Sequence, residues 1–196
     1  MAARRRRKYE FKPDPKNFNL MKVLHLTKLQ RLHLLKWTLY GAVCLLLLLI
    51  QDVLMSRIHV SGATTDLVPC AILLIGVVAG SETGGLFALI ASSLYYFSGS
   101  APGTYVIALL SFLVVGAALL RQSYFHRSFG STMFYAGAAM LLYEMGMFLI
   151  GIFMGRTYWA RAGVFFLTGV LSLAVMAALY PLVNVIGKIG GETWKE

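Results

Sequence analysis

The chain has 196 residues, of which 58% are apolar and only 13% are charged, and its formal net charge at pH 7 is +10. A soluble domain carries about 25% charged residues and cannot keep this much apolar surface away from water. The composition therefore excludes a soluble globular domain and predicts an all-α, polytopic integral membrane protein with a basic segment.

The positive charge is concentrated before Trp37, where eleven of the eighteen Lys and Arg residues lie. Residues 1–19 have little apolar content, and we expect them to form a disordered, basic cytoplasmic arm. Residues 20–36 interleave leucines with basic side chains, which predicts a basic amphipathic juxtamembrane helix on the anionic inner leaflet. The basic residues expected to face lipid are Arg4, Arg5, Arg6, Arg7, Lys8, Lys28 and Arg31.

Two alternatives for this basic segment stay open. Besides contact with the lipid surface, the segment is either a signal that only orients the protein, or a site for a dedicated partner such as a protein or nucleic acid. Each basic residue near an anionic surface contributes about 1 kcal/mol, so anionic membrane lipids are the partner we expect. Nucleic acid is not expected.

Residues 37–190 contain six apolar stretches and predict a single membrane domain, followed by a cytoplasmic tail at residues 191–196. The six transmembrane helices are expected at about 37–55, 67–80, 85–97, 104–120, 131–155 and 162–186. The second and third stretches would each be only about 20 Å long as helices, which is short for a full crossing. A charge and three glycines at residues 80–85 predict a break between them.

Orientation follows from the excess of Lys and Arg in short cytoplasmic loops. With the N-terminus inside, the inner segments hold fifteen of these residues and the outer loops hold Arg57, Arg156 and Arg161. Six spans then place both termini in the cytoplasm. Without the basic arm the comparison is four against three, so the predicted orientation depends on the N-terminal segment.

No catalytic or metal-binding motif is recognisable. The chain lacks a His-Glu-x-x-His pair, a Gly-x-Ser-x-Gly elbow and a Gly-Lys-Ser phosphate loop. Its four histidines lie outside the expected spans and show no ligand spacing. Cys44 and Cys70 fall in or beside apolar stretches, where free thiols behave as small hydrophobic groups. We therefore expect no enzymatic activity, no cofactor, no metal and no disulfide.

Three acidic residues remain as candidates in or beside the spans. Glu144 lies deep in the fifth span and is either a proton or substrate site or a buried structural carboxyl that accepts hydrogen bonds from Tyr95, Tyr96, Ser92 or Ser93. Asp66 precedes an apolar helix with proline in its first turn, and we expect it to cap that helix. Asp52 is expected near the outer surface, paired with Arg57 or Arg156.

Small residues recur at four-residue spacing, as in Gly76, Gly80 and Gly84 and again in Gly151 and Gly155. This spacing lets membrane helices approach closely. It favours a packed helical module over a wide pore.

A sequence of elements runs from Thr65 to Leu120: an acid that opens a short apolar helix, a Gly-rich turn at 80–85, a second short helix, and the turn Ser98–Gly103 before an apolar span. In this order the stretch resembles the bacterial rod shape-determining protein MreD family. The Ser-Gly-x-x-x-Gly turn of that family matches Ser98, Gly99 and Gly103, where glycine permits backbone angles that other residues resist.

The resemblance implies a non-catalytic, multi-pass protein of the bacterial cytoplasmic membrane. Its expected partners are the bitopic protein MreC and the elongation complex of a shape-determining glycosyltransferase and its transpeptidase, with MreB-like filaments possible through indirect contact. The expected structural or interface residues are Asp66, Gly99, Pro102, Gly103 and Glu144.

The fold implied by this resemblance is similar to that of the substrate-binding component of energy-coupling vitamin transporters, and that component is the alternative function. Such a component needs convergent polar and aromatic side chains in an outward pocket. Arg156, Tyr158, Trp159 and Arg161 are candidates for that pocket, whereas Asp52 and Glu144 fit poorly with them.

Overall fold

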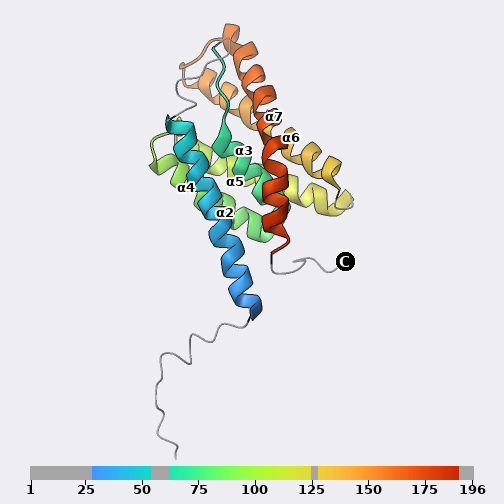
Figure 1. Cartoon of the computed structure of the whole chain (residues 1–196). Helices are drawn as coiled ribbons and strands as arrows, with labels where there is room; N and C mark the ends of the chain where they lie inside the picture. The colour runs from blue at the N-terminus through green and yellow to red at the C-terminus, as the bar shows by residue number, and fades with distance from the viewer. Residues whose placement is uncertain (1–27, 54–61, 125–127, 190–196) are drawn as a thin grey trace, which may run out of the picture.

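The computed structural model describes residues 28–53, 62–124 and 128–189, and these form an all-helical bundle (Figure 1). The helices in chain order are α2 (Lys28–Val53), α3 (Leu67–Ala79), α4 (Ser81–Phe97), α5 (Tyr105–Tyr124), α6 (Phe129–Phe153), the short 3-10 helix η2 (Trp159–Arg161) and α7 (Ala162–Gly187). The expected disordered arm, most of the expected amphipathic helix and the C-terminal tail lie outside the described residues.

Four of these helices are long and apolar enough to cross a membrane, namely residues 30–53, 105–123, 129–153 and 159–187. This confirms the helical, transmembrane character predicted from composition. The structure does not establish six spans, because α3 has 13 residues and α4 has 17. At 1.5 Å per residue they are about 20 and 25 Å long, against about 30 Å of hydrocarbon.

The first helix is longer than the sequence predicted. Residues 20–36 and 37–55 were expected to form two helices, but α2 runs without a break from Lys28 to Val53. No proline or glycine between Lys28 and Trp37 interrupts the helical backbone. The basic residue Arg31 is therefore an exposed part of the same rod that enters the bundle.

Helix α3 lies at the centre of the bundle and contacts α2, α4, α5, α6 and α7. Every one of its residues except Val78 is buried. Its sequence is apolar on all faces, which is the pattern of a helix surrounded by protein rather than one with a solvent-exposed side. The other helices form the wall around it (Figure 1).

The break between α3 and α4 is sharper than expected. It occurs at Gly80 alone, where φ is 100°, and α4 already begins at Ser81. The predicted turn over residues 80–85 is therefore wrong in extent. Gly84 lies in the first turn of α4, and a Cβ atom there would overlap the carbonyl oxygen of Gly76 on α3. The small-residue spacing does permit a close helix contact, as predicted.

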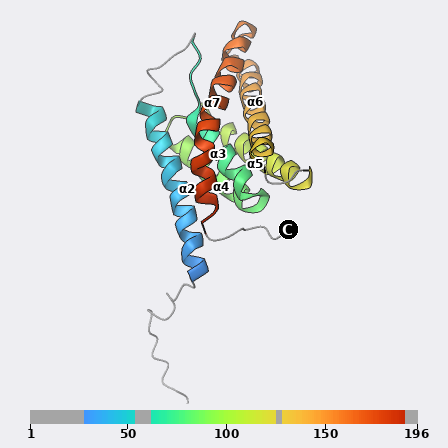
Figure 2. The ribbon, with the colours of Figure 1, turned by 45° about the vertical axis from the view of Figure 1, so that its right-hand side comes forward.

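The start of α2 and the end of α7 lie at the same end of the bundle, as both views show (Figures 1 and 2). Arg121 lies at this end as well, and its guanidinium donates to the carbonyl oxygen of Val77 at 2.6 Å. This bond satisfies a carbonyl in the last turn of α3 that has no partner within the helix. The opposite end of the bundle carries the candidate site.

Candidate functional site

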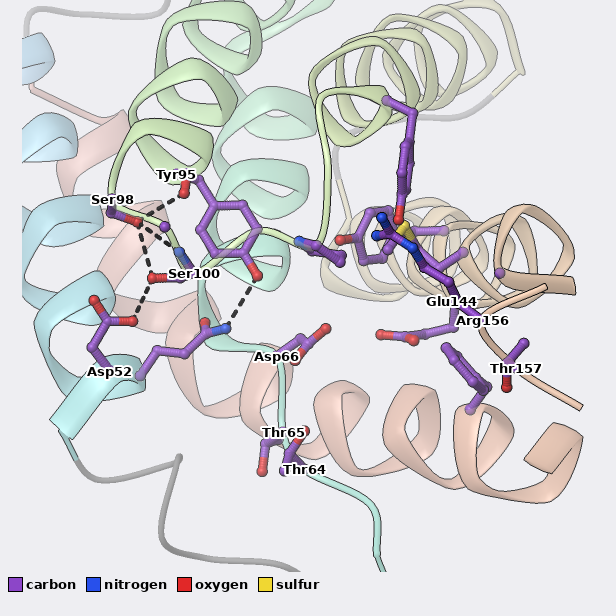
Figure 3. Close-up of a pocket in the computed structure, with 18 of the residues that line it drawn as sticks. Asp52, Thr64, Thr65, Asp66, Tyr95, Ser98, Ser100, Glu144, Arg156 and Thr157 are labelled. Atoms are coloured by element: carbon purple, nitrogen blue, oxygen red, sulfur yellow. Dashed lines mark hydrogen bonds between the residues drawn. The ribbon is translucent and has the colours of Figure 1, made fainter. Parts of the chain in front are cut away.

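A pocket of about 690 Å³ opens at the end of the bundle away from the start of α2. Its wall is made by the end of α2, the segment before α3, the loop between α4 and α5, the middle of α6 and the segment from Arg156 to Arg161 (Figure 3). Both acids and bases line it. It is therefore a polar cavity inside an otherwise apolar bundle.

Gln51, near the end of α2, holds two walls of this pocket together. Its side-chain oxygen accepts a hydrogen bond from the backbone N–H of Val68 at 2.8 Å. Its side-chain nitrogen donates to the hydroxyl of Tyr95 at 3.3 Å (Figure 3). Gln51 thus satisfies one of the free N–H groups at the start of α3, which a capping side chain usually does. Sequence reasoning missed this role, because the two residues are 17 positions apart.

Asp66 occupies the N-cap position of α3, as predicted, with extended backbone angles of φ −93° and ψ 91°. The predicted capping bond is wrong, because its side chain makes no cap hydrogen bond. Its backbone N–H donates to the hydroxyl of Ser172 on α7 at 3.1 Å, and its carboxyl lines the pocket. Burial raises the pKa of this carboxyl to about 6.

Glu144 lies in the middle of α6 and is 3% exposed. Two of the hydroxyl partners expected for it are wrong, because Ser92 and Ser93 both donate to the carbonyl oxygen of Leu89. The hydroxyl of Tyr95, a third, accepts a hydrogen bond from Gln51. The Oε1 atom of Glu144 is buried without a hydrogen-bond partner among the described residues.

The carboxyls of Asp66 and Glu144 face one another across the pocket (Figure 3). A side-chain hydrogen bond joins the two carboxyl groups. Two close carboxylates repel one another unless a proton or another cation lies between them. This pair could not be predicted from the sequence, because the two residues are 78 positions apart and only the packing of α3 against α6 brings them together.

The turn Ser98–Gly103 forms the rim of the same pocket. Gly99 has a φ of +81°, so the predicted need for glycine is confirmed there. Gly103 is small for another reason, since a Cβ atom would overlap the ring of Tyr105. Pro102 is an exposed residue on this rim.

The same turn binds the C-terminal end of α2. The hydroxyl of Ser100 donates to the carboxylate of Asp52, and the hydroxyls of Ser98 and Ser100 are 2.9 Å apart. This contact supplies a partner for Asp52 that the sequence did not predict. Arg57, one of its two expected partners, lies outside the described residues.

Helix α6 ends in a motif that delivers two further groups to the pocket. Gly155 adopts φ +68°, and the N–H groups of Gly155 and Arg156 donate to the carbonyl oxygens of Ile152 and Gly151, both at 2.9 Å. These two bonds define a Schellman ending. Arg156 follows at once on the exposed rim, and the buried hydroxyl oxygen of Thr157 has no hydrogen-bond partner among the described residues.

Of the four residues expected to form an outward pocket, only the two arginines line the observed one. Arg156 and Arg161 line the pocket together with Phe165, whereas Tyr158 and Trp159 are exposed and do not line it. Asp52 and Glu144, which were expected to fit poorly with these arginines, line the same pocket.

A second, apolar groove of about 370 Å³ lies between α2 and α4. Its floor includes the small or buried residues Gly41, Cys44 and Ala91, and its edges include the exposed residues Leu45 and Ile90. The hydroxyl of Thr83, which also lines it, donates to the backbone carbonyl oxygen of Ala79 at 2.9 Å. The sequence did not predict this groove.

No group of three or more His, Cys, Asp or Glu residues in the described part of the chain is arranged to hold a metal ion. The two thiols are free and buried, and that of Cys70 donates to the carbonyl oxygen of Ser172 at 3.3 Å.

Searches of protein-family models, curated proteins and solved structures find no match for this chain.

Proposed function

We propose that this protein is a non-catalytic scaffold of the bacterial cell-elongation machinery, in the cytoplasmic membrane, and that it binds a single-span, MreC-like partner. The observation that carries the proposal is the apolar groove between α2 and α4. The resemblance of residues 65–120 to the rod shape-determining MreD family supports the same function.

The groove has the features of a seat for a transmembrane helix. Small residues such as Gly41 and Ala91 line it, and small residues let two helix backbones approach closely in a bilayer. A Cβ atom on Gly41 would meet nothing within 4 Å, so the space beside it is open to a partner. Leu45, Leu86 and Ile90 are exposed along its edges and supply apolar packing surface.

The direction of the groove suits a partner whose folded part lies outside the membrane. It runs along α2 from Trp37 to Leu48 and along α4 to Leu94, four residues before the turn Ser98–Gly103. Asp52 and Ser100 join α2 to this turn beyond the groove. A helix in the groove therefore leaves the membrane beside the turn in which the family resemblance is concentrated.

The test uses co-purification in mild detergent with a single-span, coiled-coil partner from the same cells. Gly41→Leu fills the groove without entering the bundle, and we expect it to abolish partner recovery at normal yield. Gly116→Leu is the matched control, because Gly116 also lies in a membrane helix with nothing within 4 Å of its Cβ position. Cells that depend on the Gly41 variant should become round.

Partner recovery that is unchanged in the Gly41 variant would exclude the groove as the contact. Unchanged cell width after depletion of the protein would exclude the scaffold function itself.

The polar pocket favours a second candidate, the substrate-binding component of an energy-coupling vitamin transporter. Its volume of about 690 Å³ is in the range of small-molecule sites. Recovery of ATPase subunits and a small transmembrane coupling protein in the same pull-down, together with reduced vitamin uptake after depletion, would support this function instead.

A further inference from the structure

The side chains in the interior of the polar pocket are suited to bind a positively charged group. Glu144 is 3% exposed, it is aimed into the cavity, and its Oε1 atom has no partner among the described residues. The Glu144 side chain also shares a hydrogen bond with the carboxyl of Asp66, so a proton or another cation must lie between the two groups. The carboxyl of Asp66 faces it from the start of α3 (Figure 3).

The hydroxyl of Thr157 is the second unsatisfied group in this pocket. Its oxygen is buried without a hydrogen-bond partner, and it lines the cavity together with Glu144. Buried polar atoms are almost always hydrogen-bonded in folded proteins. Two such atoms in one cavity therefore indicate donors and acceptors that a bound molecule completes.

The mouth of the pocket has the opposite charge. Arg156 and Arg161 are exposed on its rim, on the segment that joins α6 to α7. A guanidinium group binds carboxylate or phosphate oxygens through paired hydrogen bonds. The pocket thus has two acids at depth, whereas its rim carries these two arginines together with the exposed carboxylate of Asp52, which accepts a hydrogen bond from Ser100.

The aromatic residues between these two ends favour an organic ligand over a bare ion. Tyr95 and Tyr143 are 2% and 1% exposed in the chain as a whole and still line the cavity, and Phe165 adds an apolar wall. A volume of about 690 Å³ is also far larger than a single metal ion requires.

We propose that this pocket binds a small zwitterionic amine, with its ammonium group between Asp66 and Glu144 and its anionic group at Arg156 and Arg161. An ammonium offers three donors, which match the oxygens of the two facing carboxyls. The charge separation between the interior and the mouth selects the orientation of the ligand. This inference is independent of the scaffold function, since the groove and the pocket share none of their lining residues.

The test measures binding to the purified full chain in detergent, by thermal shift and calorimetry. The probes are trialanine, its N-acetyl derivative, which lacks the ammonium, and trialaninamide, which lacks the carboxylate. We expect trialanine to bind most tightly, and the N-acetyl derivative to bind on the order of tenfold more weakly or not at all. Methylammonium at high concentration serves as a minimal probe of the carboxyl pair.

Three variants assign the contacts. Glu144→Gln removes the charge at constant size and should weaken trialanine and methylammonium by on the order of tenfold or more. Asp66→Asn removes the other charge of the pair and should weaken the same two probes. Arg161→Gln should weaken trialanine but leave trialaninamide unchanged.

Equal responses of the wild type and Glu144→Gln to every amine would overturn the proposal, as would tighter binding of N-acetyl trialanine than of trialanine. If Glu144→Gln does not fold, the same comparison with Asp66→Asn decides. Partner recovery should be unaffected in all three pocket variants, and probe binding should be unaffected in Gly41→Leu. Failure of the ligand proposal and failure of the scaffold proposal are therefore distinguishable.

Discussion

Single side chains determine the chemistry of the pocket, and Asp66 shows how the surrounding structure changes the role of a residue. Its position before an apolar helix is typical of an N-cap, and its backbone angles agree with that position. The capping bond comes instead from Gln51 on another helix. The carboxyl of Asp66 is thereby available to face Glu144 (Figure 3).

We predict that Asp66 makes stability depend on pH. Burial raises its pKa from 3.8 to about 6, so the folded state holds the proton more tightly than the unfolded state. Stability then falls as pH rises from about 4 to about 6, and the cost is complete above that range. We expect Asp66→Asn to raise the melting temperature at about pH 8, by the equivalent of up to about 3 kcal/mol, and to have little effect at about pH 4.

The measurement is thermal unfolding in detergent across this pH range. Asp52→Asn is the control, because Asp52 is exposed and its substitution removes the same charge from the same pocket. An equal effect of Asp66→Asn at both pH values would contradict the prediction.

At the scale of helices, close packing of α3 against α4 depends on the pair Gly76 and Gly84. We predict that Gly84→Ala destabilises the protein by about 1 to 3 kcal/mol, because the new methyl group would overlap a backbone oxygen that cannot move away like a flexible side chain. Thermal unfolding in detergent measures this. Gly116→Ala is the control and should be neutral or stabilising by up to about 1 kcal/mol, since its Cβ position is open. Similar melting temperatures for the two variants would contradict this packing.

The turn between α4 and α5 provides a second prediction at this scale. Gly99 has φ +81°, a conformation that a β-branched residue resists at a cost of about 1 to 3 kcal/mol. We expect Gly99→Val to lower the melting temperature and to reduce partner recovery, because the turn aligns both helices and binds Asp52. Gly99→Asn should be close to the wild type, since asparagine tolerates this conformation. Equal losses in both variants would show that the backbone angle is not the cause.

For the whole molecule, we predict that both ends of the chain are on the cytoplasmic side. The start of α2 and the end of α7 already lie at one end of the bundle (Figures 1 and 2). Glu10→Cys and Glu192→Cys should react with a membrane-impermeant thiol reagent only after the inner side is opened. Tyr158→Cys, at a side chain that is 76% exposed, should react from outside. The native thiols are buried and should stay silent. Labelling of position 10 or 192 from outside would refute this topology.

The sequence predicted the helical membrane class, the apolar segments and the break near Gly80, because these depend on local composition. The ends of α7 differ by at most one residue from the predicted span 162–186. The Asp66–Glu144 pair, the Gln51 cap and the groove beside Gly41 could not be predicted, because each depends on how distant helices pack. The start of α4 was misplaced because Ser81–Gly85 looks like a turn in isolation, although Gly84 is required for contact with α3.

The enclosure of α3 also has a consequence for biogenesis. A segment of 13 residues, surrounded by five other helices, has no stable lipid-exposed position while the chain is still being inserted. Helices α6 and α7, which cover two of its sides, are synthesised after it. Its final placement must therefore follow the insertion of α7, so we expect chains truncated before Ala162 to expose α3 and to be degraded by membrane quality control.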